Sequence, residues 1–168
     1  MLTSQEERTY PVGAIICREH ERPDGLFIVK EGLVEIFQTI QSEKGPVEII
    51  LGKVGARGIF GEMGIIDHQP RSASARALGP TRLVFISRAA FQQHLQQMPP
   101  WEAILIRTMV QRLRETTHRL ADALEQAPSG KGKAHAGDMV ISHGSEHPGA
   151  EEGDEFLREL DRRFLENS

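Results

Sequence analysis

The chain has 168 residues, of which 39% are hydrophobic, and this length is enough for one ordinary domain with an appendage that buries its core without disulfides. No stretch is long and apolar enough to span a bilayer, and the polar first residues do not predict a signal peptide. Residues 1–127 hold 15 basic and 15 acidic side chains, whereas residues 128–168 hold 5 and 9 and carry the whole net charge of −4, which excludes nucleic-acid binding by bulk positive charge.

The single cysteine, Cys17, lies in the apolar run of residues 14–17, so we expect a buried thiol rather than a reactive one. One cysteine cannot form an internal disulfide, and this is typical of a reducing compartment. Together with the polar N-terminus, this predicts a cytoplasmic protein.

Short apolar runs separated by turn signals predict β-structure in the first half of the chain. The predicted strands cover residues 14–17, 26–30, 33–38, 47–51, 72–77 and 82–86. Only Glu31 and Gly32 separate the second run from the third, which predicts a tight hairpin because Gly adopts positive φ. Strands at this spacing predict a sandwich or barrel, with a jelly roll as the natural candidate.

The period of the pattern then changes to that of helices. Ser87 is the predicted N-cap of a helix over residues 88–97, and two prolines separate it from a long helix over residues 101–126. Six positions of the long helix recur at spacings of 4 and 3, all of them apolar except Thr117: Ile106, Val110, Leu113, Thr117, Leu120 and Leu124. This spacing predicts a coiled-coil seam and a homodimer through the long helix, with packing on its own domain as the alternative.

The composition changes again after the long helix. Residues 127–153 are rich in glycine and are predicted to be a flexible linker. Residues 154–168 are predicted to form a short amphipathic helix that docks on this domain or on a partner. His135, His143 and His147 are irregularly spaced, so no metal site is predicted.

The candidate functional site is the stretch of residues 60–75. Gly61 permits a tight turn, and Glu62 opens a helical turn whose first amides point outward. Such amides and the donor fork of Arg71 are typical of a phosphate site. A carboxylate fits beside a phosphate only if the ligand also has hydroxyls, so we expect Glu62 to accept from a ribose. The alternative is a glycine-rich turn with a surface Glu and Arg.

Residues 60–74, with the sequence FGEMGIIDHQPRSAS, resemble the phosphate-binding cassette of the cyclic-nucleotide-binding domain family. The family includes catabolite-activator-type regulators and the regulatory subunits of protein kinase A. Residues 24–36 and 82–91 resemble the neighbouring strands of that family. The resemblance implies a mainly β fold with C-terminal α-helices for residues 1–126: a β jelly roll (double-stranded β-helix) with a cassette helix, a short helix and a long helix.

The resemblance implies a role for each cassette residue. Glu62 would accept a hydrogen bond from the ribose 2′-hydroxyl, and the amide of Gly61 would help to place the ribose. Arg71 would pair with the cyclic phosphate, to which Ser72 would add a hydroxyl and Ala73 a backbone amide. The predicted ligand-binding residues of the cassette are Phe60, Gly61, Glu62, Met63, Arg71, Ser72 and Ala73.

Thr116 and Thr117 resemble the Thr–Ser pair by which catabolite-activator-type proteins contact the adenine 6-amino group. Thr116 would contact the ligand of its own subunit and Thr117 that of the partner subunit. We therefore expect cAMP as the ligand, with cGMP as the alternative because Ser72 can also bond a guanine in its syn form. The chain departs from the family at Arg57, where a glycine is frequent. Residues 127–168 show no recognition helix, so direct DNA binding is not expected.

These patterns predict a sensor that binds a cyclic nucleotide and signals to an unidentified protein partner by rearranging its helices. No membrane or nucleic-acid partner and no metal is expected. The sequence shows no paired nucleophile and base, so an enzyme is not expected either. The alternative is a dimerisation or scaffold protein whose cassette binds no nucleotide, and the intact pair of Glu62 and Arg71 argues against it.

Overall fold

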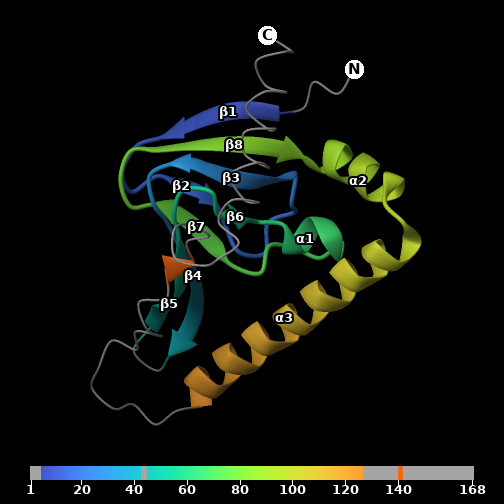
Figure 1. Ribbon diagram of the computed structural model, residues 1–168. Helices are drawn as coiled ribbons and strands as arrows, with labels where there is room; N and C mark the ends of the chain where they lie inside the picture. Colours follow the sequence, from blue (N-terminus) through green and yellow to red (C-terminus); the bar gives the residue numbers. More distant parts are fainter. Residues whose placement is uncertain (1–4, 43–44, 127–139, 142–168) are drawn as a thin grey trace.

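The computed structural model describes residues 5–42, 45–126 and 140–141, which form two β-sheets with three helices on one side of them (Figure 1). The strands are β1 (Gln5–Tyr10), β2 (Ile15–Cys17), β3 (Gly25–Glu31), β4 (Val34–Ser42), β5 (Gly45–Val54), β6 (Ile59–Phe60), β7 (Ser74–Ala77), β8 (Thr81–Ser87) and β9 (Val140–Ile141). The helices are α1 (Met63–Ile66), α2 (Arg88–Gln97) and α3 (Pro100–Gln126). The predicted mainly β fold with C-terminal helices is confirmed.

One sheet has the strand order β1-β8-β3-β6 and the other the order β2-β7-β4-β5-β9. The strands pair antiparallel, apart from β9, which runs parallel to β5 at the edge of the second sheet. Several neighbours in the sheets are far apart in sequence, as in a jelly roll, since β1 pairs with β8 and β2 with β7.

The main core lies between the two sheets and joins side chains from both. The ring of Phe27 in β3, only 2% exposed, stacks on Phe60 at 5.1 Å and lies 5.3 Å from Phe85. Cys17 belongs to this core, as predicted, and burial raises the pKa of its thiol. The thiol is therefore kept in its unreactive protonated form.

The hairpin expected at Glu31 and Gly32 is wrong. β3 pairs with β8 and β6, and β4 pairs with β5 and β7, so the turn leads from one sheet to the other. Gly32 does adopt a positive φ of 96°, and a Cβ at this position would clash with Thr81. The true hairpin joins β4 to β5, with Ser42 paired to Gly45.

The helices cover the outer face of the first sheet at the cassette end. Ile65 of α1 is fully buried in a second cluster with β3 and β8 residues, and Phe91 of α2 packs against the same cluster. The predicted cap of α2 is confirmed, because the hydroxyl of Ser87 accepts from the amide of Ala90 at 3.3 Å. Both α2 and α3 contact α1, so the two C-terminal helices meet the cassette directly.

The expected seam of α3 does not lie on a single exposed face. Val110 is only 7% exposed, and Thr117 is half-buried on the same side of the helix. The exposed apolar side chains form a second stripe that shares only Leu113 with the predicted seam: Trp101, Ile104, Leu105, Met109 and Leu113. The helix therefore has two stripes at the same spacing, and one of them packs on its own domain.

The predicted helix over residues 154–168 lies outside the described residues, as does the predicted linker apart from β9. In the part of the chain that the structure describes, no helix combines the length and the apolar character needed to cross a membrane. Within the same ranges, no cluster of His, Cys, Asp or Glu is arranged to hold a metal ion.

Candidate functional site

The cassette begins where β6 ends, at Gly61. This residue has a φ of 78°, a conformation that costs an L-amino acid roughly 1–2 kcal/mol. A Cβ here would also clash with Nη1 of Arg71, and the Gly61 carbonyl accepts a hydrogen bond from that nitrogen at 2.7 Å. Glycine is therefore required both by the turn and by the close approach of the arginine.

Arg71 is nearly fully buried, at 4% exposed, and its guanidinium is held by the backbone of another element. Nη2 donates to the Gly25 carbonyl at 2.7 Å and to Asp24 Oδ1 at 3.1 Å. The guanidinium carbon also lies 5.6 Å from the centre of the Phe27 ring. Of the five N–H groups of arginine, the one on Nε and one on Nη1 donate to no described residue. Arg71 thus combines a fixed position with donors to spare for an anion.

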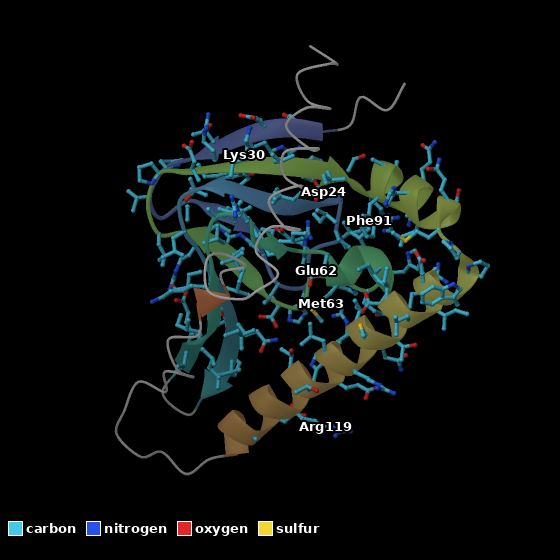
Figure 2. All side chains as sticks on the ribbon, in the orientation of Figure 1. Asp24, Lys30, Glu62, Met63, Phe91 and Arg119 are labelled. Atoms are coloured by element: carbon cyan, nitrogen blue, oxygen red, sulfur yellow. The ribbon has the colours of Figure 1, made fainter. Side chains whose placement is uncertain are left out.

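Glu62 stands at the N-terminus of α1, and its carbonyl accepts from the amides of Ile65 and Ile66, each at 3.1 Å. Burial raises the pKa of the Glu62 carboxyl above its usual value, and its own backbone amide and the charge of Arg71 oppose this rise. Figure 2 shows Glu62 and Met63 in the region between the sheets and α3. The carboxylate is poorly hydrated there, so a ligand hydroxyl would supply a hydrogen bond that water supplies badly.

The turn before the cassette contains the residue that departs from the family pattern. Arg57 has a φ of 71°, so the left-handed conformation is kept although a larger residue stands there. Two hydrogen bonds hold the turn, one from the Arg57 amide to the Val29 carbonyl at 2.8 Å and one from the Gly58 amide to the Gly55 carbonyl at 3.0 Å. The fold therefore enforces the backbone geometry that a glycine would adopt without strain.

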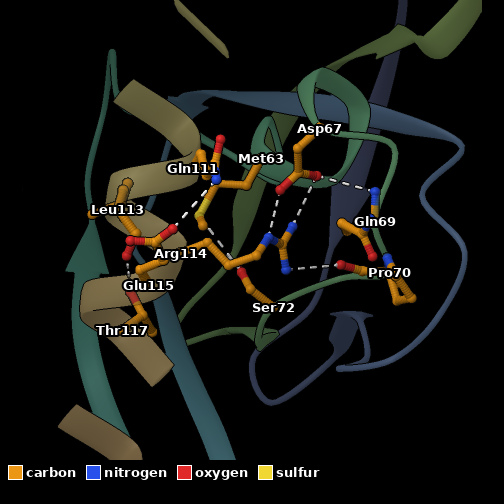
Figure 3. A network of polar contacts seen from close by, with 10 residues as sticks. All are labelled: Met63, Asp67, Gln69, Pro70, Ser72, Gln111, Leu113, Arg114, Glu115 and Thr117. Carbon is orange, nitrogen blue, oxygen red and sulfur yellow. Dashed lines mark hydrogen bonds and ion pairs between the residues drawn. The ribbon is translucent and has the colours of Figure 1, made fainter. Parts of the chain in front are cut away.

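A contact that the sequence did not predict ties the cassette to α3 (Figure 3). Arg114 of α3 binds Asp67, the residue after α1, through Nε to Oδ2 and through Nη2 to Oδ1 at 3.0 Å. Arg114 also donates to the carbonyl of Pro70, which precedes Arg71, at 3.3 Å. The side chains of Asp67 and Arg114 are only 14% and 15% exposed, so solvent screens this pair weakly. No local signal could have found it, because its members are 47 residues apart.

The other predicted residues lie around the same cassette. The Ser72 hydroxyl is 3.6 Å from the sulfur of Met63, which brings the end of the cassette against its beginning. Phe60 is buried in the main core rather than turned to the surface, so its side chain supports the turn from within. Ala73 is half-buried between Ser72 and β7. The structure thus brings the cassette residues together.

Thr116 and Thr117 lie on α3 and differ in exposure, since Thr116 is exposed and Thr117 is half-buried. Both hydroxyls donate to the preceding turn of the helix, Thr116 to the Arg112 carbonyl at 2.9 Å and Thr117 to the Leu113 carbonyl at 3.0 Å. Each side-chain oxygen is then left as an acceptor, which suits an amino group on a ligand.

The sequence profile of a known family, described as the cyclic nucleotide-binding domain, matches residues 7–98, more than half of the chain. The chain belongs to the cyclic nucleotide-binding domain family. The match runs from β1 through the cassette to α2 and ends before α3. Members of the family are regulatory binding domains rather than catalytic ones.

One curated relative is the CRP-like cAMP-activated global transcriptional regulator of Mycobacterium tuberculosis (strain CDC 1551 / Oshkosh). It is 31% identical over 115 residues, which are 68% of this chain and 50% of the regulator. The present chain thus spans about half the length of that relative.

Solved structures agree with this assignment. The cAMP bound form of the EAL enzyme Bd1971 has a TM-score of 0.62 and 32% identity over 72% of this chain and 31% of that one. The cGMP bound form of the same enzyme has a TM-score of 0.60 and 31% identity over 71% of this chain and 31% of that one. Catabolite activator protein from Thermus thermophilus has a TM-score of 0.56 and 32% identity over 71% of this chain and 55% of that one. The family is thus described by cyclic-nucleotide binding, and the two structures of the EAL enzyme Bd1971 are of forms with cAMP or cGMP bound.

Proposed function

We propose that this protein is a sensor that binds cAMP in the cassette and signals through α3. The observation that carries the proposal is the buried Arg71, held in place with two N–H groups to spare, beside the half-buried carboxylate of Glu62. The pair suits a ligand that has an anionic group and a hydroxyl on neighbouring atoms. In a 3′,5′-cyclic nucleotide these are the cyclic phosphate and the ribose 2′-hydroxyl.

The preference for cAMP rests on α3. The hydroxyls of Thr116 and Thr117 offer acceptors because their protons are used within the helix, and the 6-amino group of adenine is a donor. Thr117 lies on the stripe that faces its own domain and Thr116 on the exposed stripe. We therefore assign Thr117 to the ligand of its own subunit and Thr116 to that of a partner, the reverse of the sequence-based expectation.

Signalling in this proposal passes through the contact between Asp67 and Arg114. Asp67 follows the cassette helix and Pro70 precedes Arg71, so Arg114 touches both sides of the cassette loop. A ligand that moves this loop changes the partners of Arg114 and with them the placement of α3. The ligand shifts this equilibrium only by the difference between its affinities for the two placements.

The exposed stripe of α3 is the proposed dimer contact. Trp101, Met109 and Leu113 are 64%, 60% and 51% exposed, and a second copy of α3 would cover them. Sedimentation of the full chain tests this, and we expect a dimer that Met109→Glu converts to a monomer. His118→Glu, which adds a carboxylate at an exposed position on the opposite side of the helix, is the matched control.

Isothermal titration calorimetry of the full chain with cAMP and with cGMP tests the proposed function. We expect saturable binding of one site per chain, with cAMP the tighter ligand. Thr117→Ala should weaken cAMP more than cGMP, by roughly 2- to 12-fold for one neutral hydrogen bond. If neither nucleotide produces heat or a thermal shift at millimolar concentration, the cassette does not bind and the scaffold alternative is preferred.

A further inference from the structure

Gln38 of β4 is a buried polar residue whose two amide atoms have unequal surroundings. The residue is only 3% exposed, and its Nε2 donates to the Ser72 carbonyl at 2.7 Å. Its Oε1 is buried and accepts no hydrogen bond from any described residue. The opposite orientation of the amide would set two carbonyl oxygens against each other, so the Ser72 carbonyl decides which atom is left over.

Gln38 lies on the face of β4 that looks into the space between the sheets. Val34 belongs to the main core and Ile36 packs against it, and alternate residues of a strand share a face. Glu35, on the opposite face, pairs instead with Arg76 across the strands. The side chains of β4 that face the other sheet therefore run from the main core to Gln38, which lies beside the segment that joins the cassette to β7.

The strand that carries Gln38 contacts both the cassette and α3. The Ser72 backbone is bonded to Gln38, while the Ser72 hydroxyl lies against Met63, the neighbour of Glu62. The long helix α3, which carries Thr117, contacts β4. Gln38 is thus one hydrogen bond away from the cassette and lies on a strand that faces the helix proposed to contact the base.

A buried acceptor without a donor is uncommon, because leaving it unpaired is unfavourable. A cyclic nucleotide has two kinds of donor, the ribose 2′-hydroxyl and the N–H groups of the base, since its cyclic phosphate has no proton at neutral pH. Glu62 takes the 2′-hydroxyl in the function proposed above. The donor that remains for Gln38 is an N–H of the base. The 6-amino group of adenine has two N–H groups, so Gln38 accepts one of them, and the other serves the hydroxyls of α3.

We propose that Gln38 is a base-contact residue whose Oε1 accepts a hydrogen bond from the nucleobase of the bound cyclic nucleotide. The donor is the 6-amino group of adenine, or the N1–H or 2-amino group of guanine. Nε2 meanwhile fixes the Ser72–Ala73 peptide, and because a peptide is planar, the Ala73 N–H points away from Gln38. This inference rests on the proposed function, because it needs a cyclic nucleotide in the cassette.

The experiment compares wild type and Gln38→Met by calorimetry with three ligands: cAMP, cGMP and the 3′,5′-cyclic phosphate of purine riboside. The last ligand has the same phosphate and ribose but no N–H on its base. Loss of the Ser72 contact affects all three ligands alike, so the base contact is the additional loss. We expect Gln38→Met to weaken cAMP, cGMP or both by roughly 2- to 12-fold more than the purine riboside ligand. Gln41→Met, an exposed position on the same strand, is the control and should change none of them.

An equal loss for all three ligands would leave Gln38 only a positioning role and overturn the proposal. If Gln38→Met does not fold, as judged by circular dichroism, the same three titrations are made with Gln38→Leu, and the affinities of wild type for the three ligands are compared with one another. If wild type binds the purine riboside ligand as tightly as both natural nucleotides, the protein accepts no hydrogen bond from a base N–H, and this result also overturns the proposal. Wild type that binds none of the three refutes the proposed function itself, a result distinct from the other two.

Discussion

Replacing Arg71 should damage the protein even when no ligand is present. In Arg71→Met the Gly25 carbonyl loses a buried donor, which costs about 1–3 kcal/mol. The Gly61 carbonyl loses a partly buried donor, worth about 1 kcal/mol, and the ion pair with Asp24 adds less because Asp24 is 65% exposed. Methionine keeps part of the contact with Phe27. The expected loss is about 2–4 kcal/mol in the free energy of unfolding.

Urea unfolding followed by circular dichroism measures this loss without ligand. With a slope of about 2 kcal/mol per molar urea, the midpoint should fall by about 1–2 M. Arg82→Met is the matched control, because Arg82 is 45% exposed and its ion pair with Glu31 should contribute less than about 1 kcal/mol. All variants are compared at one protein concentration, since dimerisation would add to stability.

Unchanged unfolding of Arg71→Met would refute the reasoning, because it would mean that the Gly25 and Gly61 carbonyls are satisfied without the guanidinium. A second measurement separates folding from binding. Saturating cAMP should raise the midpoint of wild type and of Arg82→Met by mass action, and it should not raise that of Arg71→Met.

Three further variants test neighbouring parts of the site. Glu62→Gln should weaken cAMP binding about tenfold or more. It should also stabilise the ligand-free protein at pH 8, because the raised pKa of the native Glu62 carboxyl makes wild-type stability fall as the pH rises above the ordinary carboxyl range. Thermal melts from pH 8 down to 4 should show that this gain in stability disappears, and a gain that stays constant with pH would contradict the assignment. Gly61→Ala should lower stability by about 1–3 kcal/mol through backbone strain and overpacking, whereas Gly79→Ala, where a Cβ meets nothing within 4 Å, should change it little in the same urea assay. Asp67→Asn should weaken the hold of Arg114 by about 1–3 kcal/mol and so speed amide hydrogen exchange in α3, and unchanged exchange there would show that the pair does not anchor the helix.

The parts of the site that the sequence could predict are the local ones. The cassette runs without interruption from Phe60 to Ser74, so its turn, its helix start and its arginine are recognisable from neighbouring residues alone. The cap of α2 at Ser87 is local in the same sense, because the hydroxyl bonds an amide three residues away. Such features depend on short-range geometry, which the order of residues determines.

The partners of these residues could not be predicted, because they come from distant parts of the chain. Arg71 is held by Gly25, 46 residues earlier, and Asp67 is bound from α3, 47 residues later. No sequence pattern marks Gln38 as a functional residue, because its hydrogen-bond partner Ser72 lies 34 residues later. Local sequence patterns do not show which distant groups pack together. They therefore predicted which cassette residues bind the ligand, but not the distant residues that hold the cassette in place.

Two features of the fold show the same division. Gly32 marks a turn with positive φ, but whether that turn makes a hairpin or joins two sheets depends on which strands pair with β3 and β4. On α3, two apolar stripes share a spacing of three and four residues, and only the burial of Val110 against the domain shows which stripe remains exposed. The sequence by itself determined the motif, the helices and most strands, because these follow from local propensity and periodicity. The tertiary structure decided the sheet pairing, the orientation of α3 and the surroundings of the cassette, because each depends on non-local packing that minimises exposed apolar surface and unpaired polar groups.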